Sequence, residues 1–242
     1  MPIDSFLFRL AGPMQSWGTQ SRFLVRDTGT EPSKSAIIGL ICAALGKPRA
    51  EGPAEHPRLC ELAALRLAVR ADREGQLRLD YHTAGGSRSS SDDYGVIRAD
   101  ASPGGTVVSR RYYLADAEFL VGIEGEAALL ETIREALCAP RWQIFLGRKA
   151  FPPSVSIVLP GARPWDSGWR RGTRLIDAIS AYPWLGWLTR GIQDRGPAKL
   201  RLVADDSNGS ETRRDFPLSF APRRFSVRPV KTAWINFPEE AK

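Results

Sequence analysis

The chain has 242 residues, of which 43% are hydrophobic and 25% charged, and this composition supports a buried core and argues against a disordered protein. No apolar run approaches the about 20 residues that span a bilayer, and the first residues lack the layout of a signal peptide, so we expect a soluble cytoplasmic protein without membrane contact. The net charge is +7, and residues 141–242 carry 18 basic and 9 acidic groups, so the basic excess lies toward the C-terminus. Most basic groups are arginines, which suit phosphates and base edges, although a GC-rich coding sequence would produce the same bias.

Apolar periodicity predicts six elements in the first 146 residues. Strict alternation indicates strands, and spacings of three and four indicate helices, the first of which follows Ser33 and stops at Gly46. This order is that of a ferredoxin-like or RNA-recognition-motif domain, so we expect an α+β fold. The predicted elements are a strand at 6–10, a helix at 34–45, strands at 65–70 and 115–123, a helix at 126–137 and a strand at 141–146.

A long insertion separates the second and third strands of this expected domain. It covers residues 75–111 approximately and contains the segments GGSRSSSDDYG and SPGG. A compact domain of this topology needs only a short hairpin there, and insertions of this length are usually functional or disordered. We expect a thumb-like arm in the form of a β-hairpin, with a tip at residues 84–106 that is mobile when the chain is alone.

The composition changes after Gly147, where proline, tryptophan and arginine become frequent. We therefore expect two domains. Residues 1–147 would form the RNA-recognition-like domain with its arm, and residues 148–242 a smaller, basic, mostly β C-terminal domain. In the second domain, Asn208-Gly209 stands between two extended segments and predicts the turn of a hairpin.

The stretch RLAGPMQSWG, residues 9–18, places two large apolar side chains in a turn bounded by glycine and proline. Met14 and Trp17 are these two residues. Two interpretations are open: the side chains cap the core, or they present apolar faces to unstacked bases or to a partner protein.

Few residues in the sequence suit catalysis or metal binding. Only His56 and His82 are available, and the three cysteines are widely spaced, so we expect neither a metal site nor any cofactor. His82, beside Tyr81 at the base of the arm, is a candidate general base, although a polar contact is the simpler interpretation.

Two basic pairs are candidates for contact with RNA. Arg110 and Arg111 stand where the arm returns to the expected sheet, and Arg148 and Lys149 follow the Gly147 turn in LGRKAFPPS. Solvated surface charge is the alternative for the first pair, and an ordinary interdomain linker is the alternative for the second.

Five segments resemble a known family in order along the chain: RLAGPMQSWG, the helix PSKSAIIGLICAALG, DYHTAGG, RRYYLADAEF and PRWQIFLGRKAFPPS. Over residues 6–155 the sequence resembles the CasD family of subunits of the type I-E CRISPR surveillance complex, Cascade. The resemblance implies binding to the 5′ handle of the CRISPR RNA, contact with the backbone subunit CasC and the large subunit CasA, and access to target DNA through the complex. It places these residues near the handle or a neighbouring subunit: Lys34, Ser35, His82, Arg111, Arg148 and Lys149. Gln15 and Trp17 match the family's signature turn and are further candidates for RNA binding.

We therefore expect a non-catalytic RNA-binding and scaffolding subunit. The alternative is a metal-independent endoribonuclease, because relatives in another CRISPR subtype cleave precursor RNA, and such an enzyme would recruit His82, Tyr81 and Lys34. A scaffold that binds protein alone would leave the basic excess unexplained.

Overall fold

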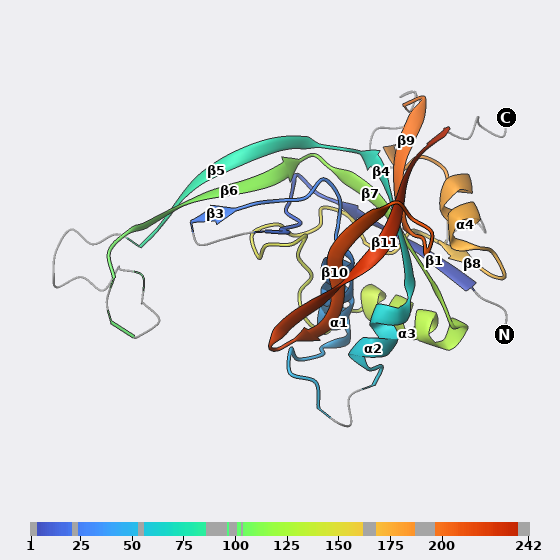
Figure 1. The fold of residues 1–242 in the computed structure, drawn as a ribbon, viewed down its shortest axis with the longest axis horizontal. Helices are drawn as coiled ribbons and strands as arrows, with labels where there is room; N and C mark the ends of the chain where they lie inside the picture. Colours follow the sequence, from blue (N-terminus) through green and yellow to red (C-terminus); the bar gives the residue numbers. More distant parts are fainter. Residues whose placement is uncertain are drawn as a thin grey trace.

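The molecule is a mixed α+β protein built on two largely antiparallel sheets (Figure 1). A seven-stranded sheet packs against the helices, and a four-stranded sheet forms an arm that projects from it. The structure, a computed structural model, describes residues 4–20, 24–52, 56–85, 96, 101–102, 104–161, 168–186 and 197–236. Within these ranges no helix is both long enough and apolar enough to cross a bilayer.

The seven-stranded sheet combines strands from both halves of the chain. Its order is β10-β11-β9-β4-β7-β1-β8, and every neighbouring pair is antiparallel. The predicted strands at 6–10, 65–70 and 115–123 are confirmed as β1, β4 and β7, with shifted ends. The bounds are Asp4–Ala11 for β1, Arg66–Arg73 for β4, Glu118–Gly125 for β7, Trp169–Arg170 for β8, Lys199–Asp205 for β9, Glu211–Phe220 for β10 and Arg223–Asn236 for β11.

Helices cover both faces of this sheet. The predicted first helix is confirmed as α1, which follows the Ser33 cap and ends at Gly46 in the left-handed conformation. The second predicted helix is confirmed as α3. Helices α1, α2 and α3 pack on one face, and α4 packs on the other. The bounds are Lys34–Leu45 for α1, Leu59–Ala64 for α2, Ala127–Cys138 for α3 and Leu175–Ala181 for α4.

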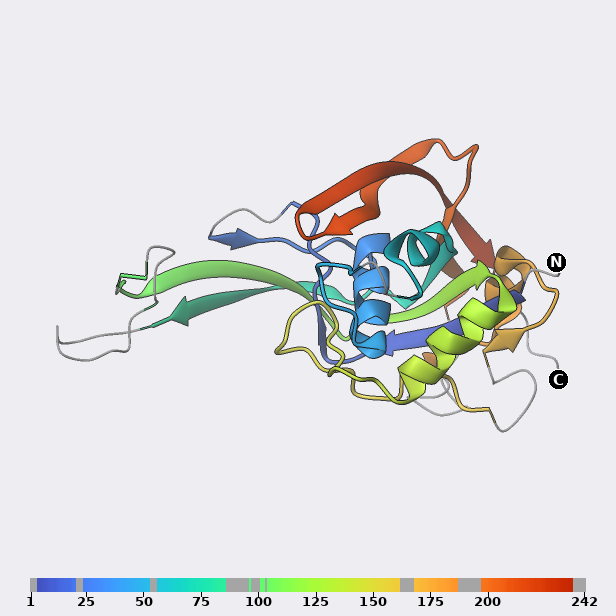
Figure 2. The same ribbon diagram turned by 90° about the horizontal axis from the view of Figure 1, so that it is seen from below.

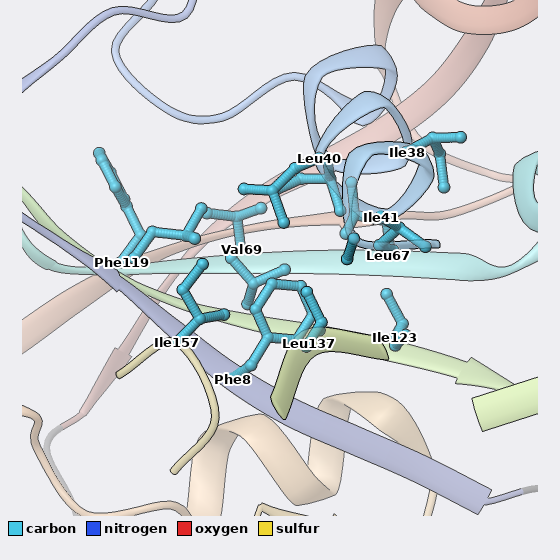
Figure 3. Packing of buried hydrophobic residues seen from close by; sticks show 14 of the residues in the cluster. Phe8, Ile38, Leu40, Ile41, Leu67, Val69, Phe119, Ile123, Leu137 and Ile157 are labelled. Carbon is cyan, nitrogen blue, oxygen red and sulfur yellow. The ribbon is translucent and has the colours of Figure 1, made fainter. Parts of the chain in front are cut away.

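The main apolar core lies between the sheet and helices α1 and α3. Successive strand residues point to opposite faces, so Phe8 of β1 belongs to this core while Leu7 packs with α4. Figure 3 shows Ile41 of α1 close to Leu67 of β4, with Leu137 of α3 near Phe8. Because successive apolar side chains of the strands point to opposite faces, the seven-stranded sheet has one apolar core on each face.

The predicted strand at residues 141–146 is wrong. This segment turns back onto the end of α1, where the Arg141 amide donates to the Ala44 carbonyl at 2.8 Å and the Trp142 amide donates to the Ala43 carbonyl at 3.1 Å. The free carbonyls at a helix C-terminus compete for the amides that a strand would use. The two-residue strand β8 takes the place beside β1 instead.

The C-terminal strands continue the same sheet. β9 pairs with β4 at residues 68–71, so one hydrogen-bonded sheet crosses the predicted boundary at Gly147, and the division into two domains stays a prediction. The predicted hairpin at Asn208-Gly209 is wrong, because β9 and β10 both pair with β11, which lies between them. With 14 residues, β11 is long enough to pair with β10 through its first half and with β9 through its second.

The β10–β11 hairpin extends over the helices. Strand β10 contacts both α1 and α2, and Figure 2 shows the hairpin on the side of α1 that faces away from α3. Phe220 near the hairpin turn packs against the main core. The hairpin therefore forms an overhang whose inner side faces α1.

The predicted arm is present as a β-hairpin. Strands β5 (Gln76–Ala84) and β6 (Val107–Ala115) pair antiparallel along their whole length. Strand β6 ends at Ala115, four residues beyond the predicted end of the arm at residue 111. Two short strands, β2 (Met14–Gln15) and β3 (Val25–Arg26), add to β6 at the base of the arm. The tip, for which we predict mobility, lies mostly outside the described residues.

Candidate nucleic-acid interface

Charged side chains from three strands share one face at the base of the arm. Arg111 of β6 is in register with Asp80 of β5 and with Arg26 of β3. Residues paired in register lie on the same face of a sheet, so these three side chains form a row across the arm. His82 lies on the same face one step along β5, with its Nδ1 3.3 Å from Asp80 Oδ2.

Arg148 reaches this row from the turn after residue 146. Its Nη2 donates to the Tyr112 carbonyl at 2.8 Å and to the Arg26 carbonyl at 3.3 Å, which fixes the guanidinium against β6 and β3. The guanidinium carbon lies 5.5 Å from the centre of the Phe151 ring. Burial lowers the pKa of Arg148, and the positive charges of Arg111 and Arg26 lower it further. Like charges are therefore crowded at this point of the surface.

Gly147 makes the approach of this turn possible. Its φ is 95°, and a Cβ at this position would lie 1.7 Å from the Ser16 carbonyl oxygen. The Ser16 amide also donates to the Leu146 carbonyl at 3.0 Å, which ties the turn to the RLAGPMQSWG segment. The exposed Lys149 follows Arg148 directly, so the turn places two cations at the base of the arm.

We name the group formed by Arg26, Arg111, Arg148 and His82 the arm-root cluster. Arg111 is partly exposed, and its Nε donates to Ser109 Oγ at 2.8 Å. Three guanidinium groups beside the carboxylates of Asp80 and Asp27 leave an excess of positive charge, and a bound anion such as a phosphate would neutralise it. The cluster can therefore bind an anion and orient it.

Sequence reasoning missed Arg26. Its place in the cluster depends on a two-residue parallel pairing between β3 and β6, whose partners are 85 residues apart. A strand this short carries no periodicity, so nothing in the sequence around Arg26 indicates the pairing.

Arg110 is not part of the cluster. It is exposed and lies in register with Val25 and Tyr81, which places it on the opposite face of the arm from Arg111. Tyr81 beside it is 65% exposed. The two arginines therefore do not share one face, because consecutive strand residues point in opposite directions, and the contact of Arg110 with RNA stays a prediction.

Gln15 and Trp17 lie inside the molecule. The Gln15 side-chain amide donates to the Leu10 carbonyl at 3.2 Å and to the Ala117 carbonyl at 2.7 Å, which ties β1 to the entrance of β7. Trp17 is 1% exposed and belongs to the main core. This burial favours the core-capping interpretation of the RLAGPMQSWG turn, and we leave both residues out of the interface.

Lys34 and Ser35 also lie away from the arm-root cluster. Lys34 is 4% exposed, with its Nζ 2.8 Å from Asp205 Oδ2, while its backbone amide donates to Asp215 Oδ2 at 2.8 Å. Arg228 bonds to both carboxylates, with its Nε 2.7 Å from Asp215 Oδ1. Burial lowers the pKa of Lys34, and the Asp205 carboxylate opposes this shift. Lys34 is thus an internal cation that anchors α1 to β9 and β10, and its place near the RNA handle or a neighbouring subunit stays a prediction.

Ser35 keeps a partly exposed position on the first turn of α1. Its hydroxyl lies 3.3 Å from that of Ser33. No group of histidine, cysteine, aspartate or glutamate in the described ranges has the arrangement of a metal site. The prediction that the chain needs no metal or cofactor stays a prediction.

Comparison with known proteins identifies the family. The family model described as "CRISPR-associated protein (Cas_Cas5)" matches residues 5–237, which is nearly the whole chain. The chain belongs to the Cas5 family of CRISPR-associated proteins. This Cas5 protein is 32% identical over 164 residues to the CRISPR system Cascade subunit CasD of Escherichia coli K12, a match that covers 63% of the chain and 69% of the relative.

Solved structures support the same assignment of the Cas5 chain. One, titled "Crystal structure of Cas protein", is 36% identical, covers 98% of this chain and 100% of its own, and gives a TM-score of 0.71. A chain from a structure titled "CRISPR RNA-guided surveillance complex" is 32% identical, covers 97% and 91%, and gives a TM-score of 0.73. The predicted resemblance to CasD is confirmed, and the match to the Cas5 family model extends beyond residue 155.

Proposed function

We propose that this Cas5 protein is a non-catalytic subunit of a CRISPR surveillance complex and binds the 5′ handle of the CRISPR RNA at the arm-root cluster. The convergence of Arg26, Arg111 and Arg148 on one face of the arm carries this proposal, and the match to CasD supports it. We further propose contacts with the backbone subunit CasC and the large subunit CasA, and with target DNA through the assembled complex. A cytoplasmic location stays a prediction.

The residues of the cluster have different parts in this proposal. Arg148 is held by two carbonyls and neighbours the exposed Lys149, so this turn suits backbone phosphates. Arg111 is partly exposed, and its planar guanidinium suits a base edge. His82 is a polar contact beside it. Arg110, with the exposed Tyr81, presents a second face of the arm to RNA or to a partner subunit.

We also propose that residues 1–147 follow the ferredoxin-like plan. The order β8-β1-β7-β4, with α1 and α3 on one face, supports this interpretation, and the arm stands in place of the short hairpin between the second and third strands. In this arrangement residues 148–242 supply the edge strand β8 together with a smaller lobe. The sheet itself is a platform from which the arm projects.

The endoribonuclease alternative is not favoured. Tyr81 and His82 are consecutive strand residues, so their side chains lie on opposite faces of the arm and do not converge on one reacting atom. Lys34 is buried and paired with Asp205. The three residues that the alternative would recruit are therefore separated.

Labelled repeat RNA is expected to remain intact when it is incubated with the purified chain. The physical reason is that His82 lies beside the Asp80 carboxylate, while Tyr81 points to the opposite face of the arm and Lys34 is paired with Asp205, so the three groups do not act on one phosphodiester. Denaturing gel electrophoresis measures the outcome. Cleavage by the wild-type chain that disappears in His82→Ala would show that the protein is a nuclease.

The tagged chain, purified from its own host, is expected to bring with it CRISPR RNA and the other subunits of a surveillance complex. RNA sequencing and mass spectrometry identify the two kinds of partner, and a nuclease-treated sample separates contacts that depend on RNA from those between proteins. If the chain is recovered with neither CRISPR RNA nor other complex subunits, the proposed function is wrong.

A further inference from the structure

A large groove runs from the arm-root cluster to the β10–β11 hairpin. Its volume is about 2110 Å³, and its walls are α1, the segments at residues 16–20 and 26–33, the turn at residues 142–149 and the inner side of the hairpin. Pockets for small molecules measure roughly 300–1,000 Å³, so this groove has the size for part of a polymer. Arg26 and Arg148 line it as well, so the groove begins at the arm-root cluster.

The lining of the groove is strongly basic. Ten of its residues are arginine or lysine and three are acidic. Two of the acidic residues are already neutralised, since Asp215 binds Arg228 and Glu31 binds Arg201. On the hairpin, by contrast, Arg214, Arg223 and Arg224 are exposed and form no ion pair with any residue that the structure describes. Their charge is available to a ligand.

Exposed apolar side chains alternate with these cations. Trp142 is 48% exposed on one wall, and Leu218 and Val227 are each 55% exposed on the hairpin. A tryptophan ring offers a stacking surface to any base, whatever the sequence. Cations beside an accessible aromatic ring are typical of grooves for single-stranded nucleic acid, because such a strand exposes both phosphates and base faces.

The hairpin wall is held in place. Arg228 of β11 bonds to Asp215 of β10 and to Asp205 of β9, and Lys34 of α1 bonds to Asp205. These buried contacts fix the hairpin to the start of α1. A fixed wall loses little conformational entropy when a strand binds, which favours affinity without requiring sequence recognition.

We propose that the groove binds a single-stranded segment of RNA adjoining the segment held at the arm root, with Arg223 and Arg224 on its phosphates and Trp142 stacked on a base. The identification of this RNA as CRISPR RNA rests on the function proposed above. The contacts in the groove are independent of base sequence, whereas the arm-root cluster supplies the preference for the handle. The β10–β11 hairpin thus holds this RNA segment in the groove.

The test compares handle RNA with handle RNA that carries a uridine tail at either end. A tail is expected to increase the affinity of the wild-type chain, and Arg223→Ala/Arg224→Ala is expected to remove that gain. The slope of the logarithm of the binding constant against the logarithm of the salt concentration should also become shallower, by about 0.7 for each phosphate that the variant no longer neutralises. Trp142→Ala should weaken binding of the tailed RNA about tenfold.

The matched control is Arg171→Ala/Arg174→Ala, which removes two exposed arginines that do not line the groove. The ratio of affinities for handle and scrambled RNA separates the two proposals, because the hairpin variant should leave it unchanged. If a uridine tail raises the affinity but the chain does not prefer handle RNA to scrambled RNA, the groove proposal is supported and the proposed function is contradicted. A hairpin variant that behaves like the control would overturn the groove proposal.

Crosslinking identifies the occupant of the groove in the assembled complex. A photoreactive amino acid at Leu218, on the hairpin, is expected to crosslink to RNA, whereas the same group at Ile176, on α4, is not. Crosslinks from position 218 to another protein instead of RNA would overturn the proposal and identify the groove as a protein interface.

Discussion

Replacing Arg70 with alanine is expected to lower the free energy of unfolding by about 3–5 kcal/mol. Arg70 is completely buried, with its Nε 2.6 Å from Asp72 Oδ1 and its Nη2 2.8 Å from Oδ2. It also donates hydrogen bonds to the carbonyls of Ile179, Tyr182 and Pro183 at 2.6–2.9 Å, which joins the end of α4 to β4. Alanine would leave a buried carboxylate and three carbonyls without this donor.

Urea unfolding of purified variants measures this effect. Arg70→Lys should lie between wild type and Arg70→Ala, because lysine keeps the charge but lacks the planar fork that bonds to the carboxylate. Arg134→Ala is the control, since it breaks a partly exposed pair with Glu131 and should change stability by about 0–1 kcal/mol. A destabilisation of Arg70→Ala below about 1 kcal/mol would contradict the structural role given to this residue.

Arg111→Ala is expected to weaken binding of the handle RNA by about 1–3 kcal/mol, or roughly 5- to 150-fold, and to abolish the preference for the handle. Arg111→Lys should keep much of the salt-dependent affinity but lose the preference, because an ammonium reproduces the charge and not the bidentate geometry. Fluorescence anisotropy with handle and scrambled RNA gives both quantities.

Arg171→Ala provides the control for charge, because this exposed residue lies outside the arm-root cluster. A purely structural role for Arg111 would lower thermal stability and leave the ratio of the two affinities intact. Among the residues that the structure describes, Arg111 bonds to Ser109 and forms no ion pair with a carboxylate, so its charge is available to RNA. Unchanged RNA binding by Arg111→Ala would remove this residue from the site.

The fold was predictable where local signals agree. Ser33 and Gly46 mark the ends of α1, since one caps the first turn and the other adopts the left-handed conformation that a helix end needs. The long insertion predicted the arm because it is bounded by alternating strand residues. Each of these features depends on neighbours in the sequence.

Features that depend on distant partners were not predictable. The pairing of β9 with β4 brings together residues 130 to 136 positions apart, and the two-residue strands β3 and β8 carry no pattern of their own. Lys34 looks like a surface cation in the sequence, yet Asp205 and Asp215 bury it. Its role follows from a fold that only the structure provides.

The candidate site shows the same division. The turn with Arg148 and Lys149 was predictable from its glycine and basic residues, whereas Arg26 joins Arg148 only through the packing of β3 on β6. Arg213, Arg214 and Arg223, Arg224 occur as two Arg-Arg pairs in the sequence, a pattern that sequence reasoning left unused. The hairpin brings the two pairs into one groove.

The most direct test of the central claim is the affinity of the purified wild-type chain for its repeat-derived handle RNA, compared with a scrambled RNA of equal length over a salt series. The handle is expected to bind more tightly at every salt concentration, because base contacts discriminate sequence, while both RNAs weaken as salt rises, because phosphate contacts release counterions. Equal affinities for the two RNAs throughout the series would contradict handle recognition by this Cas5 protein.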